Sequence, residues 1–193
     1  MDTTFARTAR REQLVEVTID LLAEVGVEGS SYLRIAERAG ISRGVLNYHF
    51  GGRAELFSAV VDTVYARGVD EVLALVEAAP SPGEALAAFV RGSVHFYAAR
   101  RRELRALTAI YTSRAADTVS REQRSEHRRE IERVGALLRA GQEAGQLRAF
   151  DVDLMTACLR SVLDLAVALT DAGADPGPLA DELVRTVHAM TST

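Results

Sequence analysis

The chain has 193 residues, of which 48% are hydrophobic and 26% charged, so it is long and apolar enough to fold around a core and is not a disordered chain. Its formal net charge is −4, and residues 1–53 carry seven arginines against seven acidic residues, which excludes a globally basic surface but allows a local basic patch. One cysteine, scattered histidines and no apolar stretch of about 20 residues exclude internal disulfides, common zinc sites and a membrane span.

Helical periodicity dominates the N-terminal part of the chain. The first predicted helix repeats its inward residues at three- and four-residue spacing: Leu14, Thr18, Leu21, Leu22 and Val25. It should end at Gly26, because glycine readily adopts the left-handed conformation that closes a helix. Ser30 or Ser31 then caps a short second helix, and Ser42 caps a third.

The same alternation of helix and break continues along the rest of the chain. Further helices are predicted over residues 53–79, 84–100, 103–116, 120–144, 151–172 and 178–190. No segment shows the period-two pattern of a strand, so we expect an all-α fold of about nine helices. The Arg- and Glu-rich stretch from Ser120 to Arg133 is typical of a solvated helix face.

Residues 30–50 combine the features that a helix-turn-helix requires. Ala36 allows two helices to cross closely, Gly40 makes the turn four residues later, and Ile41 fills the corner. Three apolar anchors face the same interior: Ile35, Leu46 and Phe50. A small residue, a glycine turn and anchors in this register favour DNA binding over a plain helical hairpin.

The other side chains of the third helix are expected to face outward, where a helix that enters the major groove contacts base edges. Arg43 can pair with guanine, Asn47 can pair with adenine, and Val45 can contact a thymine methyl group. The full set of predicted DNA-binding residues is Ser31, Ser42, Arg43, Gly44, Val45, Asn47, Tyr48, His49 and Arg53. We therefore expect a DNA-binding domain over residues 1–53, followed by a helical domain over residues 54–193.

Residues 30–57, SSYLRIAERAGISRGVLNYHFGGRAELF, resemble the signature segment of the TetR family of repressors, and Leu138–Asp153 is similar to the family's usual ending of the seventh helix. The resemblance implies a homodimer built mainly from the last two helices, a small-molecule pocket in each subunit, and repression from a palindromic operator until the small molecule binds. Two positions depart from the family pattern. Asn47 stands where tyrosine is most frequent, and Arg34 stands where an acidic residue is frequent.

The resemblance makes residues 54–193 a ligand-binding and dimerisation domain. Polar candidates for its pocket are His95, Tyr97, Thr108, Tyr111 and Cys158. The helix over 151–172 is apolar on more than one face, so it must be covered on two sides, either by a second subunit or within its own chain. The predicted dimer interface comprises Leu154, Leu159, Val162, Leu165, Leu169, Leu183 and Val187.

Catalysis, metals and cofactors are not expected, because the chain holds no HExxH, GxGxxG, GxSxG or P-loop motif. Without a secretory leader it is expected in the cytoplasm. Its expected partners are a double-stranded DNA operator, a small-molecule effector and a second copy of itself. Binding to a membrane is not expected. The alternative is a helical carrier of a lipid or other small molecule that does not bind DNA, which would leave the outward arginine and tyrosine of the third helix without a role.

Overall fold

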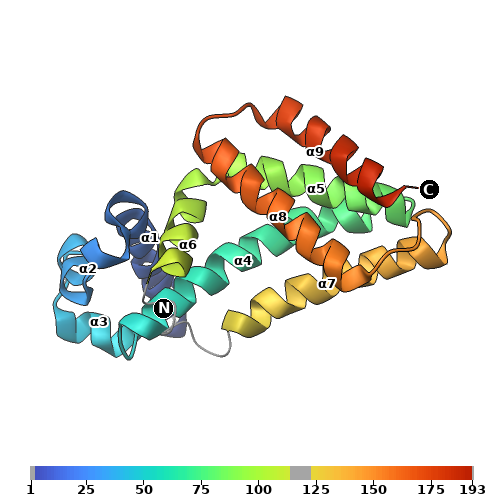
Figure 1. Cartoon of the computed structure of the whole chain (residues 1–193). Helices are drawn as coiled ribbons and strands as arrows, with labels where there is room; N and C mark the ends of the chain where they lie inside the picture. The colour runs from blue at the N-terminus through green and yellow to red at the C-terminus, as the bar shows by residue number, and fades with distance from the viewer. Residues whose placement is uncertain (1–2, 114–122, 193) are drawn as a thin grey trace. The chain divides into compact units, whose positions relative to one another are not determined.

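A computed structural model describes residues 3–113 and 123–192, and these form nine α-helices and no strand (Figure 1). The helices are α1 (Thr3–Gly29), α2 (Tyr32–Arg38), α3 (Arg43–His49), α4 (Arg53–Glu77), α5 (Pro82–Ala99), α6 (Arg101–Thr112), α7 (Gln123–Glu143), α8 (Val152–Asp171) and α9 (Pro176–Thr191). The predicted all-α class is confirmed. The expected helix ends near residues 116 and 120 lie outside the described residues. None of the described helices is long and apolar enough to cross a membrane.

Local signals in the sequence set the ends of the first three helices. The chain leaves helical geometry at Gly26, where φ is 67°, so α1 is broken there and a single helical turn follows as far as Gly29. Of the two candidate serines, Ser31 is the cap of α2, and its hydroxyl oxygen accepts the N–H of Arg34. Ser42 caps α3 in the same way through the N–H of Val45.

The described residues fall into two compact units. The N-terminal unit comprises Met1–Tyr65 with Arg102–Ser125, and the C-terminal unit comprises Ala66–Arg101 with Glu126–Thr193. The chain passes between them within α4. The units reflect contacts within the chain, and the functional domains 1–53 and 54–193 stay a prediction.

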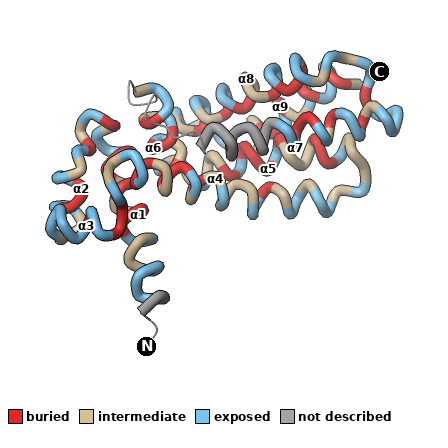
Figure 2. Tube along the Cα trace, turned by 90° about the horizontal axis from the view of Figure 1, so that it is seen from below, coloured by how far each residue is buried: buried red, intermediate tan, exposed pale blue. Residues whose placement is uncertain are grey.

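In the C-terminal unit, α5 packs against both α8 and α9 (Figure 1). Its core consists of Leu86, Val90, Val94, Val134, Leu138, Leu147, Met155, Leu159, Ala166, Ala180, Leu183 and Val187. Along each of these three helices, buried positions alternate with exposed ones (Figure 2). Each helix therefore buries one face and leaves another in solvent, as the helical periodicity predicts.

The core of the C-terminal unit offers a direct test of this packing. Leu138 is completely buried, and we expect Leu138→Ala to lower the free energy of unfolding by about 2–5 kcal/mol, because it removes buried apolar volume and leaves a cavity. The matched control is Leu75→Ala on α4, where the leucine is 50% exposed and the loss should be below about 1 kcal/mol. Urea unfolding followed by circular dichroism measures both, and equal losses would contradict the described core.

Candidate DNA-binding site

Helices α2 and α3 form a closely packed pair joined by a tight turn. Ile35, Ala36 and Leu46 are completely buried between them and α1. Gly40 adopts a positive φ of 65°, and the N–H of Ile41 donates to the carbonyl of Ala36 at 3.0 Å. A residue with a Cβ would be strained at this positive φ, which is the physical reason that the predicted turn has glycine at position 40.

The outward face of α3 carries the side chains that could meet a DNA groove. Arg43, Asn47 and Tyr48 are exposed, and so is Val45, an apolar residue that is 44% accessible. Tyr48 is 69% accessible, the largest exposure among the large hydrophobic side chains of the described residues. An exposed apolar residue and an exposed aromatic ring on one short helix indicate a binding surface, because much of each side chain stays in water in the folded chain.

The two serines among the predicted DNA-binding residues cap α2 and α3. Ser31 and Ser42 are both exposed, and their hydroxyl oxygens are occupied by backbone N–H groups of their own helices. Gly44 lies in the first turn of α3, where a Cβ would meet only the Ser42 hydroxyl, at 3.7 Å. The backbone in the first turn of α3 is therefore open to close approach by a ligand.

His49 and Arg53 are placed differently from the other predicted residues. The prediction that His49 points outward is wrong, because the beginning of α1 lies against this end of α3 and leaves His49 only 9% exposed. Its Nδ1 atom is buried and has no hydrogen-bond partner among the described residues. Arg53 is half-buried, donates from Nη2 to the Val27 carbonyl, and lies over the Phe57 ring. A DNA contact by either residue stays a prediction.

The contacts of α1 with the end of α3 were not anticipated from the sequence. Arg11 donates from Nη1 to the His49 carbonyl, and its guanidinium lies 4.1 Å from the centre of the Phe50 ring. The guanidinium of Arg7 lies 5.5 Å from the centre of the Tyr48 ring. The run RTARRE, with basic residues three and four apart, was the available signal that α1 carries a basic face.

Burial changes the ionisation of two residues in this region. Burial is the main cause that lowers the pKa of His49 below its usual 6.5, and the nearby charges of Arg10, Arg11 and Arg7 lower it further. Burial also raises the pKa of Tyr32, whose hydroxyl donates to the Phe50 carbonyl at 2.7 Å. Tyr32 and Arg11 therefore hold the two carbonyls at which α3 ends.

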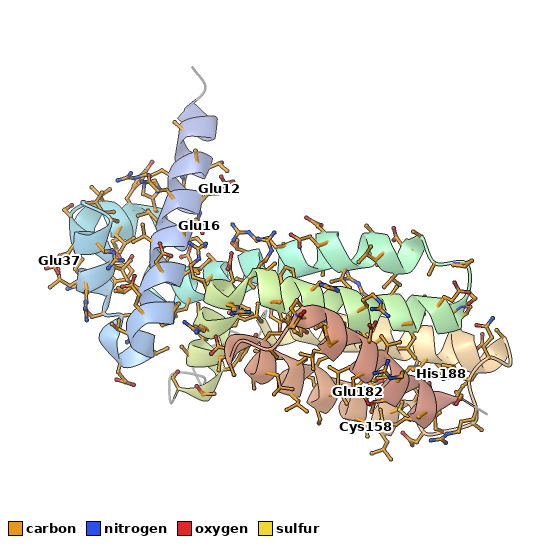
Figure 3. The ribbon with its side chains drawn as sticks, turned by 90° about the horizontal axis from the view of Figure 1, so that it is seen from above. Glu12, Glu16, Glu37, Cys158, Glu182 and His188 are labelled. Atoms are coloured by element: carbon orange, nitrogen blue, oxygen red, sulfur yellow. The ribbon has the colours of Figure 1, made fainter. Side chains whose placement is uncertain are left out.

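The five predicted ligand-binding residues are spread over both units. His95 lines a groove of about 500 Å³ in the C-terminal unit, with these neighbours: Glu71, Leu75, Ala88, Arg91, Gly92, Phe96 and Ala99. Tyr97 packs against the core of the same unit, and Cys158 is exposed on α8 (Figure 3). Thr108 and Tyr111 belong to the N-terminal unit, where the Tyr111 hydroxyl lies 3.5 Å from that of Tyr65. Their role in ligand binding stays a prediction.

The predicted dimer residues divide into two groups. Leu159, Leu183 and Val187 are buried in the core of their own chain, and Val162 packs against that core. The other three are exposed on α8, with accessible fractions of 65% for Leu154, 52% for Leu165 and 37% for Leu169. Their spacing places these three leucines on one side of the helix.

Comparisons with known proteins agree with this geometry. Residues 14–60, from α1 into α4, match the family described as bacterial regulatory proteins, tetR family. The crystal structure of PfmR, a TetR family transcriptional regulator from Thermus thermophilus, is 25% identical, with a TM-score of 0.73 over 93% of this chain and 94% of PfmR. Residues 14–60 therefore carry the segment typical of the TetR family, and the whole chain shares the fold of a TetR-family regulator.

Two further relatives show how far the likeness extends. The HTH-type transcriptional regulator BetI of Klebsiella pneumoniae (strain 342) is 34% identical over 86 residues, or 44% of each chain. The match therefore spans less than half of that relative. AibR, solved in complex with isovaleryl coenzyme A and operator DNA, is 17% identical, with a TM-score of 0.76 over 92% of this chain and 97% of AibR. That level of identity establishes that this chain and AibR share a fold, and nothing more specific.

The lowered pKa of His49 predicts how stability depends on pH. A proton binds more readily to the unfolded chain than to the folded one, so the free energy of unfolding should fall as pH decreases from about 6.5 through the lower pKa of the folded state. We expect His49→Gln to remove this part of the dependence. Thermal unfolding of both proteins between pH 7.5 and 5 measures the difference, and parallel curves would contradict the prediction.

Proposed function

We propose that this chain is a DNA-binding transcriptional regulator of the TetR family that reads base edges with α3. The observation that carries the proposal is the division of α3 into a buried side, anchored by Leu46, and an exposed side bearing Arg43, Asn47 and Tyr48. Arginine and asparagine supply the bidentate donors that distinguish guanine and adenine, and the tyrosine hydroxyl suits a phosphate. Arg43 and Val45 lie at the start of the helix, the part that reaches base edges in helix-turn-helix proteins.

We infer that the regulator acts as a homodimer on a palindromic operator. The three exposed leucines of α8 form an apolar stripe that a second copy would cover, and α9 and α5 already pack against other parts of α8. A two-fold dimer presents two copies of α3, and these must match half-sites about one DNA turn, roughly 34–36 Å, apart. In such a dimer, each seven-residue reading helix would need to contact only one half-site.

We further propose that a small molecule controls DNA binding and that the regulator is a repressor. The fold is shared with AibR, whose structure holds both an acyl coenzyme A and operator DNA. A ligand can release DNA only if it binds the released conformation more tightly than the DNA-bound one, since equal affinities shift no equilibrium. The groove beside His95 in the C-terminal unit is a candidate place for such a ligand. A reporter gene behind the selected operator tests repression, which predicts higher expression when the regulator is deleted.

The DNA-reading face is tested by selecting bound sequences from random duplex DNA. We expect the wild-type chain to enrich a palindrome and the double variant Arg43→Ala, Tyr48→Ala to enrich none, because removing a base contact costs about 1–3 kcal/mol in every half-site. The matched control is Arg139→Ala, Arg185→Ala, which removes two exposed side chains from the C-terminal unit. If the wild type enriches nothing even at low salt, the proposal fails and a small-molecule carrier becomes the better interpretation.

The dimer is tested by placing a charge on the α8 stripe. Leu165→Glu should convert the dimer to a monomer in analytical ultracentrifugation, because a buried, unpaired carboxylate is costly at an interface. It should leave the helical content unchanged, since Leu165 is exposed in the single chain. Leu33→Glu, at a leucine that is 54% exposed on α2, is the control and should remain dimeric. A dimeric Leu165→Glu would place the interface elsewhere.

A further inference from the structure

The charges of α1 are segregated along the helix. Three arginines, Arg7, Arg10 and Arg11, occupy its beginning, and the first turn contains no acidic residue. The acidic residues come later on the same helix, beginning with Glu12 and Glu16 (Figure 3). The basic and acidic side chains of α1 therefore occupy different stretches of the same helix.

Three of the later acidic residues of α1 are paired with arginines inside the N-terminal unit. Arg102 on α6 contacts Glu16 at 2.6 Å and Asp20 at 2.8 Å, and Arg38 on α2 forms a two-bonded pair with Glu24. Of the acidic residues that balance the arginines over residues 1–53, Glu16, Asp20 and Glu24 thus already have basic partners. Before Glu12, the charged side chains at the beginning of α1 are the arginines Arg7, Arg10 and Arg11.

Only one of the three arginines is used to hold the fold. Arg11 donates to the His49 carbonyl, lies over the Phe50 ring and approaches Glu55 at 3.4 Å. For Arg7 and Arg10 the described residues record no ion pair. Arg7 lies over the Tyr48 ring and is exposed, and Arg10 donates to Gln13 on its own helix at 2.6 Å.

Arg7 and Arg10 lie beside the DNA-reading face of α3. Tyr48 links the two elements, because its ring touches Arg7 on one side and meets the His49 ring edge-on with centroids 5.3 Å apart. Both guanidiniums are also close enough to His49 to oppose its protonation. The exposed surface thus continues from Arg43 and Tyr48 onto the beginning of α1.

We propose that Arg7 and Arg10 bind the phosphate backbone of DNA next to the bases that α3 reads, an inference that rests on the proposed DNA-binding function. Guanidinium groups fit phosphate oxygens through paired N–H donors. Contacts of this kind add affinity and fix the register of the protein on the duplex, and they carry no sequence information themselves. Arg11 is a positioning residue that holds α1 against the end of α3.

The test is the salt dependence of binding to the duplex that the wild type selects, measured by fluorescence anisotropy between 50 and 200 mM salt. The key variant is Arg7→Gln, Arg10→Gln. Each arginine that binds a phosphate contributes about 0.9 to the slope of log affinity against log salt, so a dimer without these four arginines should have a slope smaller by about 3.6. Over this fourfold range of salt, the wild type should lose about 150-fold more affinity than the variant. Arg7→Lys, Arg10→Lys should keep the wild-type slope.

Two controls separate this inference from the proposed function. Arg139→Gln, Arg185→Gln removes the same net charge from the C-terminal unit and should keep the slope, while the key variant should still select the wild-type sequence and keep its melting temperature. If the wild type binds no DNA, the proposed function fails and this inference fails with it. If the wild type binds and the key variant keeps the full slope, or selects a different sequence, phosphate binding by Arg7 and Arg10 is refuted while the proposed role of α3 stands.

Discussion

The shortness of α3 is the constraint on which the rest of the N-terminal unit depends. A seven-residue helix is too short to be stable in water by itself, so tertiary contacts must hold it. Leu46 and Phe50 bury its inner side, and Tyr32 and Arg11 bind the carbonyls at its end. The side chains on the inner side of α3 are therefore used to hold the helix in place. The side chains free to face a ligand are therefore those of the opposite side, and their directions are set by the same packing that holds the helix.

Local charge arrangement explains how a chain with a net charge of −4 can present a surface suited to DNA. In physiological salt, exposed charges separated by more than about 8 Å are largely screened from one another. Three acidic residues of α1, Glu16, Asp20 and Glu24, are paired with arginines of α2 and α6, and many of the remaining acidic residues of the chain lie in the C-terminal unit. Within the N-terminal unit, a phosphate beside α3 would meet Arg43 at the start of the helix or Arg7 and Arg10 near its end, and such local charges matter more for binding than the net charge of the whole chain.

The sequence predicted the features that depend on neighbouring residues and missed those that depend on distant ones. Gly26, Gly40 and Ser42 could be assigned, and the cap of α2 narrowed to Ser30 or Ser31, because turns and caps are local, and the inward residues of each helix follow from its period. His49 was misplaced because its burial comes from α1, which lies almost forty residues earlier in the chain. Leu159, Leu183 and Val187 show the same limit, since periodicity reveals an apolar face and not whether the same chain or a second copy covers it.

The packing of the C-terminal unit narrows the choice of surfaces for a second copy. Because α5 contacts both α8 and α9, the apolar side chains that these helices turn toward it are already covered, and they contribute to the stability of the single chain. The stripe of Leu154, Leu165 and Leu169 has no such cover among the described residues. Association through this stripe would join two reading helices into one molecule. Once the first helix is bound, the second meets its half-site at a high effective concentration, so two modest contacts can give one specific complex.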